Sequence, residues 1–203
     1  MGYGVSSRSY LKRAKCRINE NTDEGLFYAA LELRSFLEAR QDEYLDAQRT
    51  YAKSMPAAWE TSKQWKALQR ISKSDKIQHL NFSFSDGWTL EAFHVPVTET
   101  FRKATEKLSD MLHAQAVYRP PESPWWEEAR HKVIAVYRSA WLCQQGTLLC
   151  PALVDKDMIE GRLALLLPGG ETEEYAKRFA KDQTMFVKVN YLESVPNQWS
   201  PDL

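Results

Sequence analysis

The stretch NTDEGLFYAALELRSFLEARQDEYLDAQRTY, from Asn21 to Tyr51, decides the fold of this chain. Its leucines, alanines and aromatic residues recur at spacings of three, four and seven, which places them on one face of an α-helix. Asn21 can cap the first turn, and Glu24 stands where its carboxylate can reach back to the cap. The sequence therefore predicts a long helix in the centre of the core, which runs to about Ser54 ahead of Pro56.

Helical spacing and helix caps recur along the rest of the chain. A short N-terminal helix is expected from Ser9 onward, with Ser9 or Ser7 as its cap. Further helices are expected at Ala57–Ile71, Thr98–Ala116, Pro124–Gln145 and Thr172–Lys181.

Between these helices the period changes to two, which is typical of strands. Leu80, Phe82 and Phe84 alternate with polar residues, and Asp86-Gly87 follows as a turn signal. The sequence therefore predicts a β-hairpin over residues 78–95. Later strands are expected at Thr147–Val154, Ile159–Leu167 and Met185–Tyr191, and Pro151 makes the first of them an edge or bulged strand.

These elements predict an α+β fold, in which a helical bundle is packed with a small antiparallel β-sheet. The proline-rich run from Arg119 to Pro124 is the best internal boundary. It separates residues 1–118, the helical part with the hairpin, from residues 119–203, a helix plus strands. We expect the two parts to pack as one compact domain.

Composition excludes some classes of protein. The 203 residues include 27 basic and 27 acidic ones, so the net charge is zero and the surface as a whole is not built for nucleic acid. The three cysteines are sparse and are expected to be buried, reduced thiols. The basic start of the chain carries no secretory signal, and the longest apolar run, Leu163–Leu167, is too short to cross a membrane. We therefore expect a cytoplasmic protein that does not bind membranes.

The motifs of metal and nucleophile chemistry are absent from the sequence. The four histidines are scattered, and no paired C-x-x-C spacing, phosphate-binding glycine loop or G-x-S-x-G elbow is present. The sequence therefore predicts no metal, no cofactor and no catalytic residue.

Charged residues of the long helix are the first candidates for a binding site. Arg34, Glu38 and Arg40 stand within a strongly apolar stretch. Arg34 and Glu38 can form an exposed pair one turn apart. Alternatively, at least one arginine points into a groove and binds a phosphate or carboxylate through two hydrogen bonds.

A basic segment near the start of the chain is the second candidate site. It comprises Arg8, Lys12, Arg13, Lys15 and Arg17. Interleaved with tyrosines, these residues could contact a nucleic-acid backbone or an acidic protein surface. The alternative is the solvated face of a helix.

The segment LFYAALELRSFLEARQDEYL resembles the helices of HEPN-type domains, small bundles found in bacterial RNases, toxins and abortive-infection proteins. The shared features are an alanine-rich apolar helix, an internal Leu-Arg and a following Glu-Ala-Arg, over about residues 21–51. The family's catalytic R-x(4-6)-H pattern is absent, because no arginine stands five to seven residues before any histidine. The resemblance therefore implies a non-catalytic member, which binds nucleotides, RNA or a partner protein and is often a dimer.

Two functions follow from the sequence. The first is a non-enzymatic interaction or accessory protein of a bacterial or phage defence or stress system. Its partner would be a protein or a second copy of the chain, or nucleic acid bound by the basic segment. The alternative is a metal-independent RNA-processing enzyme of degraded HEPN type, in which folding brings Arg34 and Arg40 together with one of His79, His94 or His113.

Overall fold

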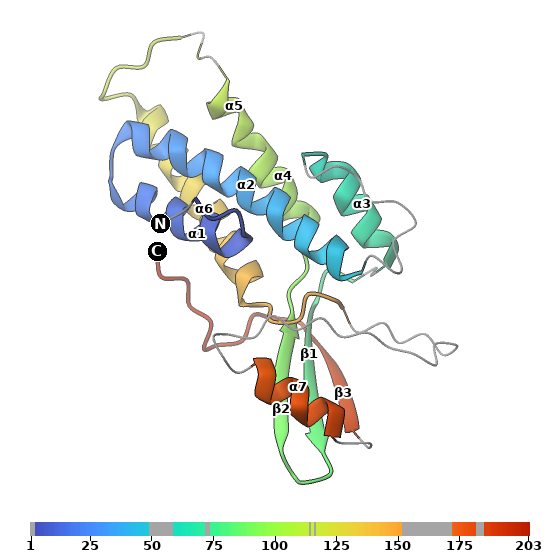
Figure 1. Cartoon of the computed structure of the whole chain (residues 1–203). Coiled ribbons are helices and arrows are strands. Elements are labelled where there is room, and N and C mark those ends of the chain that lie inside the picture. The colour runs from blue at the N-terminus through green and yellow to red at the C-terminus, as the bar shows by residue number, and fades with distance from the viewer. Residues whose placement is uncertain are drawn as a thin grey trace.

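The structure is a computed structural model that describes residues 3–48, 59–71, 74–113, 115, 117–151, 172–181 and 185–203. Its helices form a bundle at one end of the molecule and its sheet lies at the other (Figure 1). This arrangement confirms the predicted α+β fold. The central helix is α2 (Asp23–Ala47), which packs against every other helix of the bundle. These helices are α1 (Ser7–Asn19), α3 (Thr61–Ile71), α4 (Glu99–Lys107), α5 (Ser109–Leu112) and α6 (Pro124–Gln145).

The long helix is present, but its predicted cap is wrong. Thr22 is the N-cap, and its side chain accepts a hydrogen bond from the backbone N–H of Gly25 at 3.0 Å. Asn21 instead has a φ of 53°, a conformation that asparagine tolerates and that turns the chain from α1 into α2. An N-cap needs extended backbone, so Asn21 cannot serve. At the other end Gln48 follows the helix, and residues 49–54 lie outside the described part of the chain.

Two other helix predictions need correction. The first helix begins at Ser7 because Ser6, rather than Ser7 or Ser9, accepts the capping hydrogen bond from the N–H of Ser9. The helix expected at Thr98–Ala116 is divided into α4 and α5 at Leu108, whose N–H bonds to an oxygen only three residues back. It ends at Leu112, because the backbone of the next residue is extended.

The sheet has three antiparallel strands in the order β2-β1-β3. The predicted hairpin is confirmed as β1 (Ile77–Phe84) and β2 (Thr89–His94), and β3 (Met185–Leu192) pairs with the other edge of β1. The strand expected at Thr147–Val154 is wrong over its described residues, 147–151. Only Leu148 bonds to the hairpin through its backbone, while Thr147 uses its side-chain oxygen. Residues 152–154 and the expected strand Ile159–Leu167 lie outside the described residues.

One face of the sheet holds a small core of its own. Leu80, Phe82 and Phe84 are buried there, as their alternation predicted. The helix α7 (Thr172–Lys181) lies across this face (Figure 1), and its Phe179 packs edge-on against both phenylalanines of β1. Because α6 packs in the bundle and β3 in the sheet, residues 119–203 contribute to both layers.

The close approach of α1 and α2 gives a stability test. A Cβ on Gly25 would lie 2.6 Å from the backbone oxygen of Arg17, which cannot move without shifting α1. We expect Gly25→Ala to lower the free energy of unfolding by about 1–3 kcal/mol in urea titrations, because overpacking forces backbone shifts. The control Ser35→Ala, on a half-exposed position of α2, should stay within about 0.5 kcal/mol of the parent. Equal stability of the two variants would contradict the close packing.

Candidate functional site

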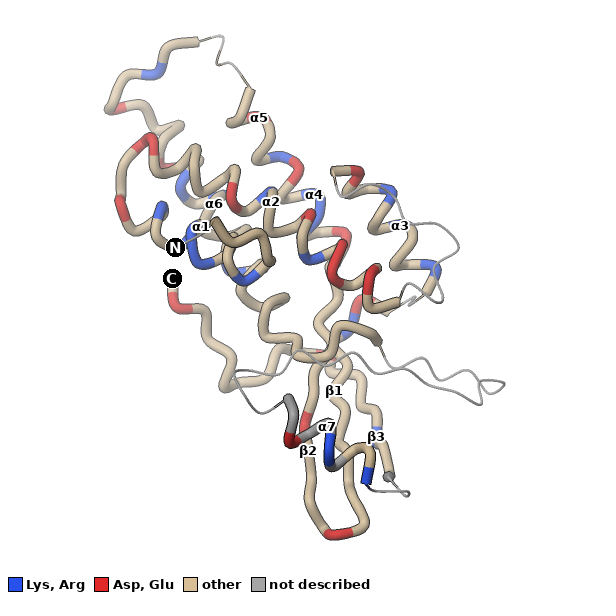
Figure 2. Tube along the Cα trace, viewed as in Figure 1, with Lys and Arg blue, Asp and Glu red and all other residues tan. Residues whose placement is uncertain are grey.

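The basic segment lies on α1 (Figure 2). Three of its five side chains form ion pairs with carboxylates. Arg13 donates from Nε to both carboxylate oxygens of Glu32, each at 2.9 Å. Hydrogen bonding to Glu32 raises the pKa of Arg13. Arg17 pairs with Glu20 at 2.7 Å, and Lys15 pairs with Asp202 at 2.5 Å.

The other two basic residues are open to a ligand. Arg8 and Lys12 are exposed, and neither forms an ion pair with any residue that the structure describes. They stand four residues apart, and Lys15 follows three residues later, so the three cations share one face of α1. Of the five residues of the predicted binding segment, Arg8, Lys12 and Lys15 thus form one line along α1, which we call the basic stripe.

Arg34 has the geometry of the exposed pair. Its Nε donates to Glu38 at 3.2 Å one turn along α2, and an Nη lies 3.5 Å from the hydroxyl of Ser109 on α5. Both side chains of the pair are partly exposed, so the pair contributes at most about 1 kcal/mol to stability.

Arg40, in contrast, is fully buried and fastens α2 to the end of α6. One Nη donates to the backbone oxygens of Cys143 and Gly146, at 3.0 and 2.7 Å. The other Nη donates to Glu43 at 3.2 Å. Burial alone would lower the pKa of Arg40, but Tyr44, Cys143 and Glu43 together raise it above its ordinary value. The guanidinium therefore stays charged and caps the negative end of α6.

Next to Arg40 lies a buried cluster of titratable side chains, Tyr44, His94 and Cys143. The hydroxyl of Tyr44 donates to the backbone oxygen of Val95 at 2.6 Å, and the Sγ of Cys143 lies 3.6 Å from the same oxygen. His94 Nδ1 lies 3.0 Å from the backbone oxygen of Leu148 and donates to it. Burial lowers the pKa of His94 to about 4 and raises those of Tyr44 and Cys143. At neutral pH all three side chains are therefore uncharged and bonded to the backbone.

The structure brings only part of the predicted enzyme site together. Arg40 and His94 both contact the ring of Tyr44, at 4.5 and 5.0 Å between centres, but both are buried. Arg34 is committed to Glu38 on a more exposed side of α2.

The remaining two candidate histidines lie in other elements. His79 stacks on Phe93 in the sheet, and His113 is exposed after α5. Arg34 and Arg40 have their hydrogen-bond partners elsewhere, on α2, α5 and the end of α6.

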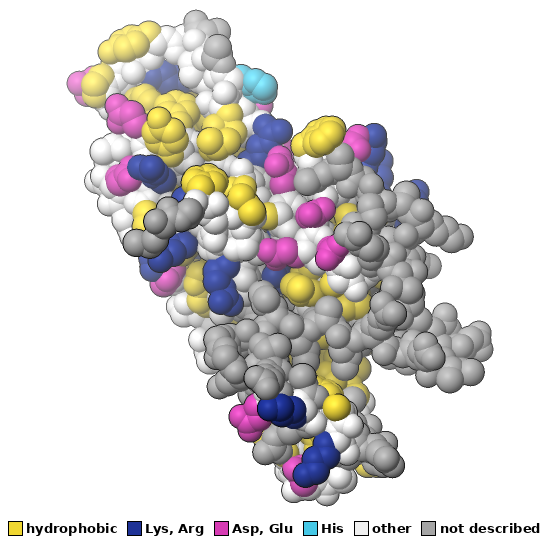
Figure 3. Space-filling view, viewed as in Figure 1, with side chains coloured by type: hydrophobic (Ala, Val, Ile, Leu, Met, Phe, Trp, Pro, Cys, Tyr) yellow, Lys and Arg dark blue, Asp and Glu magenta, His cyan; other side chains and the backbone are white. Residues whose placement is uncertain are grey.

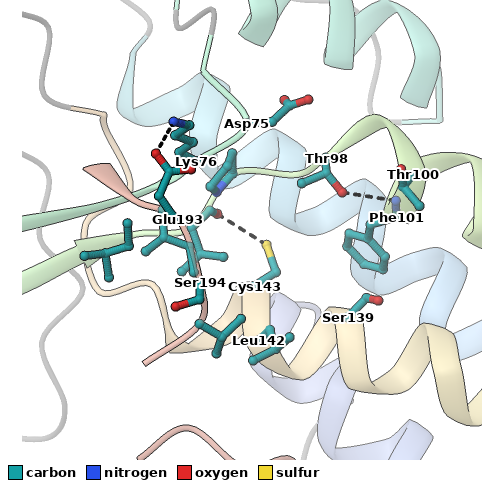
Figure 4. Close-up of a pocket in the computed structure, with 15 residues that line it drawn as sticks. Asp75, Lys76, Thr98, Thr100, Phe101, Ser139, Leu142, Cys143, Glu193 and Ser194 are labelled. Carbon is teal, nitrogen blue, oxygen red and sulfur yellow. Dashed lines mark hydrogen bonds and ion pairs between the residues drawn. The ribbon is translucent and has the colours of Figure 1, made fainter. Parts of the chain in front are cut away.

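A hollow of about 350 Å³ lies where the bundle meets the sheet (Figure 4). Four stretches of chain surround it: the start of β1, the connection into α4, the last turns of α6 and the end of β3. Its apolar lining is Ile77, Val95, Pro96, Phe101, Leu142, Leu192 and Val195. Cys143 belongs to both the hollow and the buried cluster, so the hollow lies directly over the joint that Arg40 fastens.

Polar groups around the hollow are largely engaged within the chain. Lys76 and Glu193 pair with each other at 2.5 Å, as Figure 4 shows. Thr98 caps α4 by accepting from the N–H of Phe101, and the hydroxyl of Ser139 donates to the backbone. The thiol of Cys143 is held protonated by burial. Among the described lining residues, no hydrogen bond joins a serine, threonine or cysteine to a carboxylate or histidine, the pairing that activates a nucleophile.

Comparison with protein-family models, curated proteins and solved structures finds no match to this chain. Within the described residues, no three histidine, cysteine or acidic side chains are placed to hold a metal ion. No helix in that same part of the chain is long and apolar enough to cross a membrane.

Sequence reasoning missed the hollow and the acceptor Asp202. The lining residues come from four separate stretches, and none of these stretches has a motif spacing of its own. One signal was available for Arg40: it stands three residues after Leu37 and four before Tyr44, on the buried face of the helix. That spacing distinguishes it from Arg34.

Substitution of the two arginines tests this division of roles. We expect Arg40→Met to lower the free energy of unfolding by about 3 kcal/mol or more, because two backbone oxygens at the end of α6 lose their buried donor. The control Arg34→Met should change it by at most about 1 kcal/mol. Urea titration of both variants measures the difference, and similar losses would contradict the buried placement of Arg40.

His94 predicts a specific pH dependence of stability. Its pKa is about 4 in the folded chain against an ordinary value of 6.5, so only the unfolded chain takes up a proton between these values. The stability it supports is complete above pH 6.5 and falls by up to about 1.4 kcal/mol per pH unit as the pH drops toward 4. His94→Asn keeps a donor for Leu148 without titrating. Wild type should therefore lose more stability than the variant in this window, whereas parallel curves would refute the assignment.

Proposed function

We propose that this chain is a non-enzymatic interaction protein that docks a protein partner by accepting a large apolar side chain in the hollow. The observation that supports the proposal is the contrast between the two neighbouring sites. The buried cluster has reactive side chains that are bonded to the backbone, while the hollow above it has an apolar floor and an open mouth.

A protein side chain fits the hollow better than a polar small molecule. Small-molecule sites carry a few converging polar groups that are ready to bind the ligand. Here Lys76 and Glu193 instead bind each other at the mouth. An apolar centre with a polar, charged rim is the anatomy of a protein interface. Val195, one of the lining residues, is 38% exposed, so part of the apolar lining is accessible to a partner.

The enzyme alternative has less support. It requires Arg34, Arg40 and a histidine to face one substrate, but Arg40 and His94 are buried and Arg34 lies apart from them. The HEPN resemblance and the role in a bacterial or phage defence or stress system stay predictions, and a non-catalytic docking protein is consistent with both.

Selection of peptides from a random display library on the immobilised protein tests the proposal. We expect the selected peptides to share one large apolar residue and to bind Leu142→Gln at least about tenfold more weakly. Burial of such a side chain contributes about 1.5–3 kcal/mol, which a polar floor removes.

Leu31→Gln is the matched control, because Leu31 is 48% exposed on α2 and does not line the hollow. Figure 3 shows apolar side chains among charged ones over one face of the molecule. A peptide that binds exposed apolar side chains nonspecifically would therefore be weakened by either substitution. Equal loss in both variants, or selected peptides without a common apolar residue, would refute docking in the hollow. Cleavage of labelled single-stranded RNA in the presence of a chelator, abolished by Arg34→Ala, would favour the enzyme instead.

A further inference from the structure

Residues 196–203 lie along the bundle and return the chain to the neighbourhood of its start (Figure 1). They contact a surface made by Lys15 of α1, Tyr137 and Arg138 of α6, and Phe93 of β2. We call these four residues the strap surface and residues 199–203, WSPDL, the strap.

The strap surface holds a carboxylate with two donors from two helices. Lys15 donates from Nζ to Oδ2 of Asp202 at 2.5 Å, and the hydroxyl of Tyr137 donates to Oδ1 at 2.7 Å. Tyr137 is only 2% exposed, so its position is set by the core, while the side chain of Asp202 is 47% exposed. Hydrogen bonds from Lys15 and Tyr137 lower the pKa of Asp202. The donors thus belong to the bundle, and the carboxylate lies on its outside.

Two further contacts fix the direction of the strap. The ring of Trp199 packs edge-on against Phe93 with 4.9 Å between centres. Arg138 donates from Nε to the main-chain oxygen of Leu203 at 2.8 Å. An aromatic ring, a carboxylate three residues later and the following main-chain oxygen are therefore recognised separately, as in the binding of an extended peptide.

The basic stripe of α1 continues this surface upstream. Ser7 donates to Gln144, and Lys15 shares Asp202 with Tyr137, so α1 and α6 run antiparallel. Trp199 packs on Phe93, which bonds to Leu148 just beyond the end of α6, while Asp202 reaches Tyr137 earlier in α6, so the strap runs in the same direction as α1. The residues ahead of Asp202 therefore lie toward the end of α1 that carries Lys12 and Arg8. This chain has no acidic residue between Glu193 and Asp202 to meet those two cations.

From these contacts we infer that the strap surface and the stripe of Arg8 and Lys12 form a binding site for an acidic, extended segment of a partner protein. The segment carries an aromatic residue three positions before an aspartate and further acidic residues close to them. In the free chain the strap occupies the same site and competes with the partner. This site is separate from the hollow, and the inference does not rest on docking there.

Peptide binding to the full chain tests the inference. One labelled peptide is SVPNQWSPDL, the sequence of residues 194–203, and a second, SVPEEWEPDL, adds three glutamates. The released variant carries Trp199→Ala and Asp202→Ala, which remove the anchors of the chain's own strap. By fluorescence anisotropy we expect it to bind the acidic peptide at least about tenfold more tightly than wild type, since an attached competitor acts at high effective concentration.

Charge reversals in the released variant assign the contacts. Lys15→Glu should weaken both peptides at least about tenfold, whereas Lys12→Glu should weaken the acidic peptide and leave SVPNQWSPDL almost unchanged. Lys107→Glu, on an exposed position of α4, is the matched control and should have no effect. Asp202→Asn, which removes one charge, serves in place of the released variant if thermal unfolding shows the latter to be unfolded.

Several outcomes would overturn the inference. Equal peptide affinity of wild type and released variant would show that the strap does not compete. Equal effects of Lys15→Glu and Lys107→Glu would show that the strap surface is not the site. Displacement of the acidic peptide by single-stranded RNA would assign the basic stripe to nucleic acid. A dimer that exchanges straps and excludes the peptide would make a second copy the occupant.

Discussion

The guanidinium of Arg40 is the contact on which the arrangement of bundle and sheet depends. A buried charge is stable only when it is paired and hydrogen-bonded, and here one Nη bonds to two backbone oxygens at the end of α6. Glu43, one turn further along α2, holds the other Nη and accepts from the N–H and hydroxyl of Ser7 at the start of α1. A single turn of α2 therefore fixes the ends of two other helices. Tyr44, in the same turn, bonds to Val95 as the chain leaves β2 and so attaches the sheet.

This joint explains why reactive side chains meet without forming a catalytic site. Tyr44, His94 and Cys143 come together because each satisfies, or packs against, a backbone oxygen at the join. Their hydrogen bonds stabilise the protein only while water is excluded, and that exclusion holds the thiol and the phenol in their neutral forms. The hollow is the space left where the tips of α4, α6 and two strands converge on the joint. An apolar surface of this kind is suited to selecting a partner by shape.

Much of the fold could be predicted from the sequence because it is set by local rules. Ser123 and Pro124 start α6 where expected, and the alternation of Leu80, Phe82 and Phe84 identified the buried face of β1. The errors come from competition between neighbouring residues. Asn21 and Thr22 both favour cap positions. Thr22, whose backbone is extended, is the N-cap, and Asn21 forms the turn before it with a positive φ.

The candidate site was much less predictable, because its contacts join residues far apart in sequence. Arg13 pairs with Glu32 on α2 and Lys15 pairs with Asp202, so two of the five charges of the basic segment are neutralised by carboxylates from distant parts of the chain. A pattern within one helix can show that cations share a face, but not which of them a distant carboxylate neutralises.

The hollow and the strap surface depend on one continuous piece of chain. Residues 192–195 form a wall of the hollow, and the strap begins four residues after Val195. The wall has two supports. The first is the pairing of β3 with β1 together with the ion pair of Lys76 and Glu193. The second, beyond Val195, is the set of contacts that hold the strap. A ligand that displaces the strap removes the second support and leaves the first. If both proposals hold, binding at one site changes the support of the wall at the other, and the two sites are then thermodynamically linked in both directions. The sign of that coupling is set by whether the partner in the hollow binds the fixed wall or the released one more tightly.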